Sequence, residues 1–118
     1  MIRIASAVLL VGLAALSSPG AFANDFPTQA RVEWVLSCMR ANQDIAQAAM
    51  YKCSCAIDAI ADQVSYDEWT NLSTVANGIT MAGERGGELR DLKDGRAMVT
   101  RYREIQAKAR KGCFLEKK

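Results

Sequence analysis

Cysteine is the residue type that most constrains how this chain can fold. Four cysteines stand at positions 38, 53, 55 and 113, and the chain contains no histidine. In an oxidising compartment, an even set of cysteines in a small domain pairs as structural disulfides. Each bridge contributes about 2–4 kcal/mol, a large share of a typical net stability of about 5–15 kcal/mol. We therefore expect two disulfides that staple a small domain.

Residues 1–23 have the layout of a cleaved secretory signal peptide. Arg3 supplies the positive charge, Ile4–Leu16 is an apolar run, and Ala21-Phe22-Ala23 offers small residues for cleavage. The apolar run is shorter than the ~20 residues that a membrane span needs. No cysteine follows the expected cleavage point, so a lipid anchor is not indicated. We expect cleavage after Ala23, no membrane anchor, and one mature periplasmic domain over residues 24–118.

The mature sequence predicts helices and no strands. Apolar residues recur at helical spacing, as in Ile45, Ala49, Cys53, Ile57, Ile60 and Val64. Ser65 with Glu68 three residues later is a capping-box pattern that starts a further helix. The predicted fold is an all-α, disulfide-stapled bundle of three to four helices. These run over about Thr28–Ala41, Ile45–Val64, Ser65–Met81, and from Asp94 or Arg96 to Lys111.

The helix assignments predict which cysteines pair. Cys53 and Cys55 are two residues apart on one helix, so at ~100° per residue they point to nearly opposite sides. A hairpin turning near residues 42–44 brings Cys38 closest to positions 50–53. The favoured pairing is therefore Cys38–Cys53 with Cys55–Cys113, and the alternative is the crossed pairing, Cys38–Cys55 with Cys53–Cys113.

The Cys53-Ser54-Cys55 motif allows two other interpretations. It could be a redox pair, although it lacks the CxxC spacing of thioredoxin-like enzymes. It could also bind Cu(I) with help from Met39, Met50, Met81 or Met98. Those methionines lie on apolar stripes, where methionine usually packs. Trp34 and Trp69 are likewise expected to be core or partly buried anchors.

Charge is distributed unevenly along the mature chain. Residues 24–95 carry 11 Asp or Glu and 6 Lys or Arg, a net charge of −5. Residues 96–118 carry 8 Lys or Arg and 2 Glu, a net charge of +6. The basic C-terminal helix is either a solvated surface or a docking surface for an acidic partner. Outside the cytoplasm, nucleic acid is not an expected partner.

Carboxylates are the remaining candidates for a functional site. Without histidine or a free thiol, metal ligands must be oxygens, which favours calcium, magnesium, manganese or a trivalent lanthanide. The first candidate set is spaced along the glycine-interrupted segment 83–95 and comprises Glu84, Glu88, Asp91 and Asp94. The second set comprises Asp58, Asp62, Asp67 and Glu68.

The first set does not follow the EF-hand pattern, and basic residues are interspersed with it. Arg85, Arg90 and Lys93 could pair with the same carboxylates in surface salt bridges. An open site of this kind supplies few ligands. A large bound ion would complete its coordination with water, small anions or a second copy of the chain.

Three stretches resemble the landiscernin family, small periplasmic proteins that accompany the lanthanide-dependent, PQQ-containing alcohol dehydrogenases of methylotrophic bacteria. They are Tyr51-Lys52-Cys53-Ser54-Cys55-Ala56-Ile57-Asp58, Ser65-Tyr66-Asp67-Glu68 and Ala82-Gly83-Glu84-Arg85-Gly86-Gly87. The resemblance implies a surface lanthanide site with few protein ligands and a metal-bridged homodimer. It also implies transfer of the ion to lanmodulin, an acidic lanthanide-binding partner, for which residues 96–118 would be a docking surface.

Three functions are therefore expected in order. The first is a periplasmic carrier or chaperone for a lanthanide of the lanthanum–neodymium class, with calcium as an alternative ion. The second is a metal-free interaction or accessory module, and the third is a redox or Cu(I)-handling protein. We do not expect an enzyme, because the sequence has no histidine base, nucleophile elbow, phosphate loop or carboxylate pair with a definable cleft.

Overall fold

The computed structural model describes residues 24–115 of the chain. The expected signal peptide lies outside the described residues, and so do residues 116–118. The described part is all-α, with five helices rather than the three to four expected. They are α1 (Thr28–Ala41), α2 (Ala46–Ala61), α3 (Tyr66–Gly78), α4 (Glu84–Arg90) and α5 (Gly95–Gly112), with a 3₁₀ turn over Gln43–Ile45.

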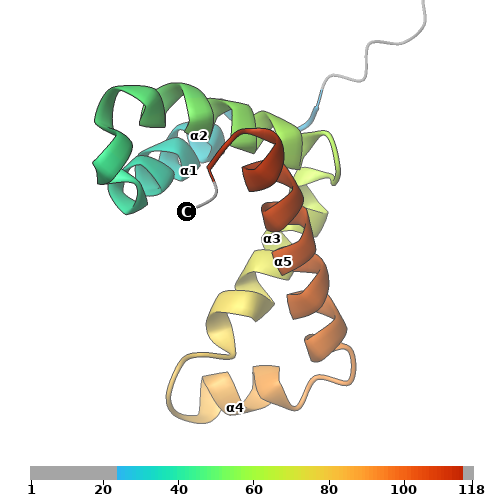
Figure 1. Cartoon of the computed structure of the whole chain (residues 1–118). Helices are drawn as coiled ribbons and strands as arrows, with labels where there is room; N and C mark the ends of the chain where they lie inside the picture. Colours follow the sequence, from blue (N-terminus) through green and yellow to red (C-terminus); the bar gives the residue numbers. More distant parts are fainter. Residues whose placement is uncertain (1–23, 116–118) are drawn as a thin grey trace, which may run out of the picture.

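The helices form two arms that meet at an angle (Figure 1). In one arm α1 and α2 pack as a hairpin, and in the other α3 packs along α5. The C-terminal end of α5 returns to α2, while α4 closes the far end of the second arm. We call α1, α2 and residues 109–115 the stapled half. We call residues 75–99, which include α4, the distal half.

Both disulfides follow the favoured pairing and lie in the stapled half. Cys38 is bonded to Cys53, and Cys55 is bonded to Cys113. No cysteine is left free. The bridges indicate an oxidising, extracytoplasmic location. Among the described residues, no helix combines the length and apolar character that a membrane span requires.

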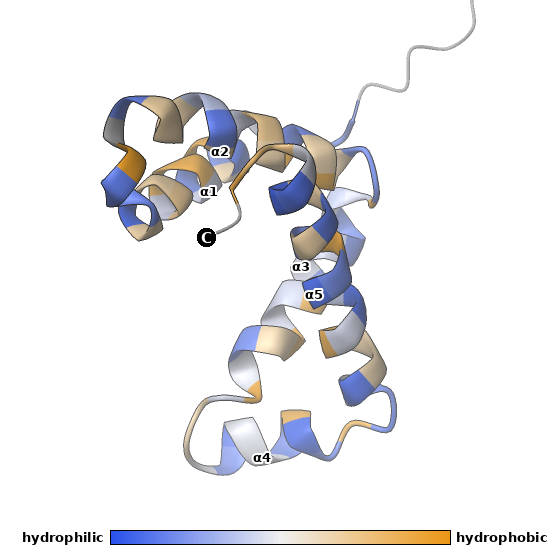
Figure 2. Cartoon of the chain, viewed as in Figure 1, coloured by the Kyte–Doolittle hydropathy of each residue, from blue (hydrophilic) through white to orange (hydrophobic). Residues whose placement is uncertain are grey.

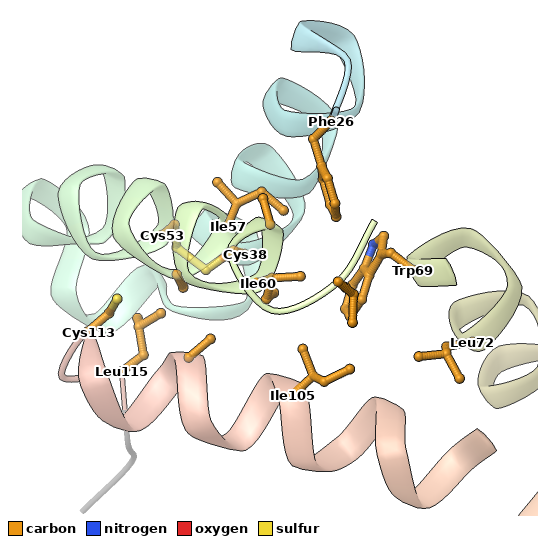
Figure 3. Close-up of a cluster of buried hydrophobic side chains, with 14 residues drawn as sticks. Phe26, Cys38, Cys53, Ile57, Ile60, Trp69, Leu72, Ile105, Cys113 and Leu115 are labelled. Carbon is orange, nitrogen blue, oxygen red and sulfur yellow. A yellow bond between two sulfur atoms is a disulfide. The ribbon is translucent and has the colours of Figure 1, made fainter. Parts of the chain in front are cut away.

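The core lies where α2, α3 and α5 meet (Figure 3). Ile60 and Cys53 are completely buried there. The Trp69 ring lies 4.9 Å from the Tyr102 ring, and Phe26 packs edge-on against Tyr66 at 5.3 Å. Complete burial of a large aliphatic side chain such as Ile60 stabilises the fold by about 1.5–3 kcal/mol. This cluster therefore holds the two arms together.

The predicted cap at the start of α3 is present, with one difference. The Ser65 hydroxyl accepts a hydrogen bond from the Glu68 amide at 3.2 Å. The Glu68 carboxylate does not complete the box, because it accepts a hydrogen bond from Arg101 on α5 at 2.6 Å. The capping residue therefore begins α3, while Glu68 joins α3 to α5.

Two expected helices end earlier than predicted, and one helix was not predicted. α2 ends at Ala61 rather than Val64, and α3 ends at Gly78 rather than Met81. The segment expected to be a flexible, glycine-interrupted loop contains α4. The two glycines in this segment, Gly86 and Gly87, lie within the helix. At Gly86 a side chain would not fit, because a Cβ there would lie 2.0 Å from the Met81 carbonyl oxygen. Gly86 thus allows α4 to pack against the preceding loop.

The apolar residues of α1, which recur at helical spacing at positions 32, 35, 36 and 39, are only partly buried. Val35 and Met39 pack against the core, as predicted for a stripe that faces inward. Val32 is 52% exposed and Leu36 is 49% exposed. Helical spacing identified α1 correctly, but the other helices cover only one side of the stripe.

Candidate functional site

The first set of predicted metal ligands is exposed on and beside α4. Glu84, Glu88 and Asp91 are spaced by four and three residues, so they share one side of the helix. Asp94 follows in the turn before α5. All four side chains are exposed. None forms an ion pair, since the ion pairs among residues 24–115 are Arg31–Asp58 and Arg101–Glu68.

The position of α4 is determined by backbone contacts. Gly83 precedes the helix with a φ of 88°, a conformation that favours glycine. The Arg90 guanidinium Nη1 donates to the carbonyl oxygens of Ile79 at 3.0 Å and Met81 at 3.1 Å. Arg90 therefore connects α4 to the end of α3. It does not form the salt bridge with the α4 carboxylates that the sequence had allowed.

The second set of predicted ligands is not brought together as one group. Asp58 is paired with Arg31 of α1, and Glu68 is paired with Arg101 of α5. The Asp67 carboxylate accepts a hydrogen bond from the Asn71 amide at 3.4 Å. Two of the four carboxylates are thus used in contacts between helices. Such contacts favour a structural role for them.

Asp62 and Glu68 of the second set do share one hollow with a residue that sequence reasoning missed. Asp25 lines the same hollow, which has a volume of about 470 Å³ and lies beside the α2–α3 connection. The Asp25 carboxylate accepts a hydrogen bond from the Tyr66 amide at 2.9 Å. No local pattern relates Asp25 to Asp62, because the tertiary fold alone brings the N-terminal segment to this connection.

The carboxylates nevertheless do not form a closed cage. Across the described residues, no group of three or more histidine, cysteine, aspartate or glutamate side chains is placed to hold a metal ion. The carboxylates on α4 are therefore an open surface. They could approach a cation from one side only.

A second hollow lies between α1, α3 and α5 and was also missed. Its volume is about 430 Å³, and its lining includes Trp34, Trp69, Tyr102, Asn77 and Gln106. The Gln106 amide donates to the Tyr102 hydroxyl at 2.9 Å. Burial raises the pKa of Tyr102 above its usual value, while hydrogen bonds from Gln106 and Asn77 oppose that shift. The tryptophans are half-buried or buried, as expected, but they also line this hollow.

Exposed aromatic residues lie near the second disulfide. Tyr51 is 73% exposed and Phe114 is 79% exposed. The Lys52 ammonium donates to the Phe114 carbonyl oxygen at 3.0 Å, which joins the middle of α2 to the segment that follows α5. Phe114 has a φ of 56°, a conformation that is unfavourable for a bulky residue. The backbone at the disulfide therefore holds this ring at the surface.

No family model, curated protein or solved structure matches the chain.

Proposed function

We propose that this protein is a periplasmic carrier of a hard metal cation, most favourably a trivalent lanthanide, bound through the exposed carboxylates of α4. The observation that carries the proposal is the arrangement of Glu84, Glu88 and Asp91 on one side of a helix, with no cation paired to them in the described chain. Asp94 stands in the turn between α4 and α5 and is a further exposed carboxylate.

The charge arrangement favours a cation over any other ligand at this surface. Like charges at a spacing of four residues destabilise a helix by about 0.2–0.5 kcal/mol. A cation between Glu84 and Glu88 removes that repulsion and contributes attraction. A trivalent ion gains more from the same carboxylates than calcium does, because the attraction scales with charge. Lanthanides and calcium both accept the oxygen ligands that α4 offers.

An open site on one helix explains how the ion could be both bound and released. The carboxylates supply part of the coordination shell, and water, small anions or the carboxylates of a second copy supply the rest. A metal-bridged homodimer would thus combine two α4 surfaces around the ion. The same incomplete shell would let a partner with a complete cage, such as an acidic protein of the lanmodulin type, remove the ion.

Isothermal titration calorimetry with lanthanum tests the proposal. Replacing both Glu84 and Glu88 with Gln should weaken lanthanum binding at least tenfold without changing the helical circular dichroism. Asp62→Asn is the matched control, because it removes a carboxylate from the other predicted set and should leave the affinity unchanged. Equal binding by the Glu84→Gln/Glu88→Gln variant and the parent would contradict the α4 site.

Terbium luminescence separates the two predicted sets. Trp69 follows Glu68 directly, at the start of α3, whereas α4 lies at the far end of the second arm (Figure 1). We expect calorimetric binding of terbium with little tryptophan-sensitised emission. Strong sensitised emission that disappears in Asp62→Asn would instead place the ion in the hollow lined by Asp25, Asp62 and Glu68.

The exposed aromatics favour a metal-free interaction module as a second candidate function. Tyr51 and Phe114 lie by the Cys55–Cys113 bridge, with Lys52 and Lys111 close by in the chain. Aromatic anchors beside basic residues are typical of protein-binding surfaces.

The Phe114→Ala/Tyr51→Ala variant should lose binding to purified lanmodulin in calorimetry, and Val32→Ala is the exposed apolar control. Unchanged binding would exclude these aromatics as the docking site.

A further inference from the structure

A cavity with three arginines lies between α4 and the first three turns of α5. It has a volume of about 470 Å³, within the ~300–1,000 Å³ range of small-molecule sites. Its polar lining comprises Arg90, Arg96, Arg103 and Thr100, and its apolar lining comprises Ile79, Leu89 and Val99, with Gly95 completing it. Among residues 24–115, no carboxylate lines it.

The two helices present these side chains for clear geometric reasons. Arg96, Val99, Thr100 and Arg103 are spaced by three, one and three residues, so they lie on one side of α5. On α4, Leu89 and Arg90 are turned by ~100–160° from Glu84 and Glu88. The helix α4 therefore carries its carboxylates on one side and contributes Leu89 and Arg90 to the cavity from another.

The wall of the cavity is packed closely. A Cβ at Gly78 would lie 2.1 Å from the Leu89 Cδ1 atom, and a Cβ at Gly95 would lie 3.1 Å from the Leu89 carbonyl oxygen. The hydrogen bonds from Arg90 Nη1 to the Ile79 and Met81 carbonyl oxygens hold this guanidinium in place at the edge of the cavity. The cavity is thus a built feature of the helix packing.

The positive charge of the cavity is not balanced within the described chain. Arg96 and Arg103 belong to neither of the ion pairs formed among residues 24–115. Guanidinium groups bind carboxylates through two parallel hydrogen bonds, which gives both affinity and orientation. The apolar side chains, Ile79, Leu89 and Val99, would contact the carbon skeleton of a ligand rather than its charged groups.

We infer that this cavity binds a small organic di- or tricarboxylate. Three guanidiniums match two or three carboxylates, the Thr100 hydroxyl can donate to one of them, and the apolar lining distinguishes an organic skeleton from an inorganic anion. This site lies on the opposite side of α4 from the proposed cation surface. It goes beyond the proposed function and does not depend on it.

Calorimetry with citrate and tricarballylate tests the inference on the oxidised mature protein in metal-free buffer at low salt. We expect saturable binding with a Kd below the millimolar range. Arg103→Gln and Arg96→Gln should each weaken it at least tenfold. Lys108→Gln is the matched control, because Lys108 is exposed on the same helix and does not line the cavity. It removes the same charge and should change the affinity less than twofold.

Three outcomes would overturn the inference. The first is the absence of binding by either tricarboxylate at millimolar concentration. The second is equal weakening by Arg103→Gln and Lys108→Gln, which would reveal a general charge effect. The third is inorganic phosphate binding as tightly as tricarballylate, which would show that the apolar lining contributes nothing. If either arginine variant fails to fold, Thr100→Val replaces it, because this change is nearly isosteric. Weaker tricarboxylate binding by Thr100→Val than by the parent would support the site.

Discussion

The stapled and distal halves of this molecule are held together in different ways. The stapled half contains both disulfides, and its largest fully buried side chains, Ile60 and Cys53, lie in α2. The distal half has no cysteine and is assembled by close backbone packing at glycines and by hydrogen bonds from Arg90. Figure 2 shows that hydrophobic residues are more frequent in α2 than in α5.

This difference separates stability from chemistry. Covalent bridges and apolar burial let the stapled half supply most of the stability of a small domain. The distal half can then expose carboxylates on α4 and leave arginines unpaired around a cavity, although neither arrangement stabilises it. The following variants test whether the halves are as unequal as this contrast implies.

Removing a disulfide should have the largest effect. The Cys55–Cys113 bridge spans 58 residues and the Cys38–Cys53 bridge spans 15. By loop-closure entropy, Cys55→Ser/Cys113→Ser should lower the free energy of unfolding by about 4 kcal/mol and Cys38→Ser/Cys53→Ser by about 3 kcal/mol. Urea denaturation followed by circular dichroism measures both. A loss below 1 kcal/mol for both variants would show that the bridges do not dominate the stability of the stapled half.

Adding a methyl group to α4 should have the next largest effect. The Cβ of Gly86→Ala would clash with the Met81 carbonyl oxygen, and a backbone atom cannot yield easily. We expect a loss of about 1–3 kcal/mol, the usual cost of overpacking. At Gly87 the nearest atom to a Cβ is Arg90 Nη2 at 3.9 Å. Gly87→Ala should therefore stabilise the protein by about 0.5–1 kcal/mol through helix propensity.

Urea denaturation measures the free energy of unfolding of both alanine variants. Gly87→Ala is the control for Gly86→Ala, because it makes the same substitution at the next position of the helix. Equal stabilities would mean that α4 is not packed against the α3–α4 loop. In that case the arginine cavity would lose its wall, and the distal half would be looser than the structure indicates.

The smallest predicted effect concerns the junction between the halves and appears at alkaline pH. Burial raises the pKa of Tyr102 above its usual value of 10.0. The folded state therefore favours the neutral phenol. Its contribution to stability is complete below pH ~10 and is lost as the pH rises through the folded pKa. Tyr102→Phe should flatten the decline in the free energy of unfolding above pH ~10, as measured by urea denaturation.

Tyr51→Phe is the matched control for this measurement, since Tyr51 is 73% exposed on α2. A decline that is as steep in Tyr102→Phe as in the parent would show that the phenol does not couple pH to stability.

Much of the stapled half could be predicted from local patterns. The helical period identified the regions of α1, α2, α3 and α5, and the turn near residues 42–44 correctly indicated that Cys38 pairs with Cys53. The opposite directions of Cys53 and Cys55 then left Cys113 for Cys55. The Ser65 cap was also predicted, since capping depends on residues three positions apart. In each case the determining contact is short in sequence or follows from helix geometry.

The candidate sites could be predicted only in part. The sequence identified Glu84, Glu88, Asp91 and Asp94 as carboxylates near one another, but it did not predict that α4 would place three of them on one side. It could not assign Arg101 to Glu68 or Arg31 to Asp58, because these pairs join different helices. Asp25 beside Asp62 and the arginine cavity were missed for the same reason.

The sequence by itself determined an all-α, disulfide-bridged protein, because helical periodicity and cysteine spacing act within or between neighbouring segments. Only the tertiary structure decided which carboxylates and arginines are paired and which remain free. Those outcomes depend on how α3, α4 and α5 approach one another, and that approach is determined by glycine contacts and buried side chains from distant parts of the chain. Free charge is a property of the assembled surface, and no local pattern specifies it.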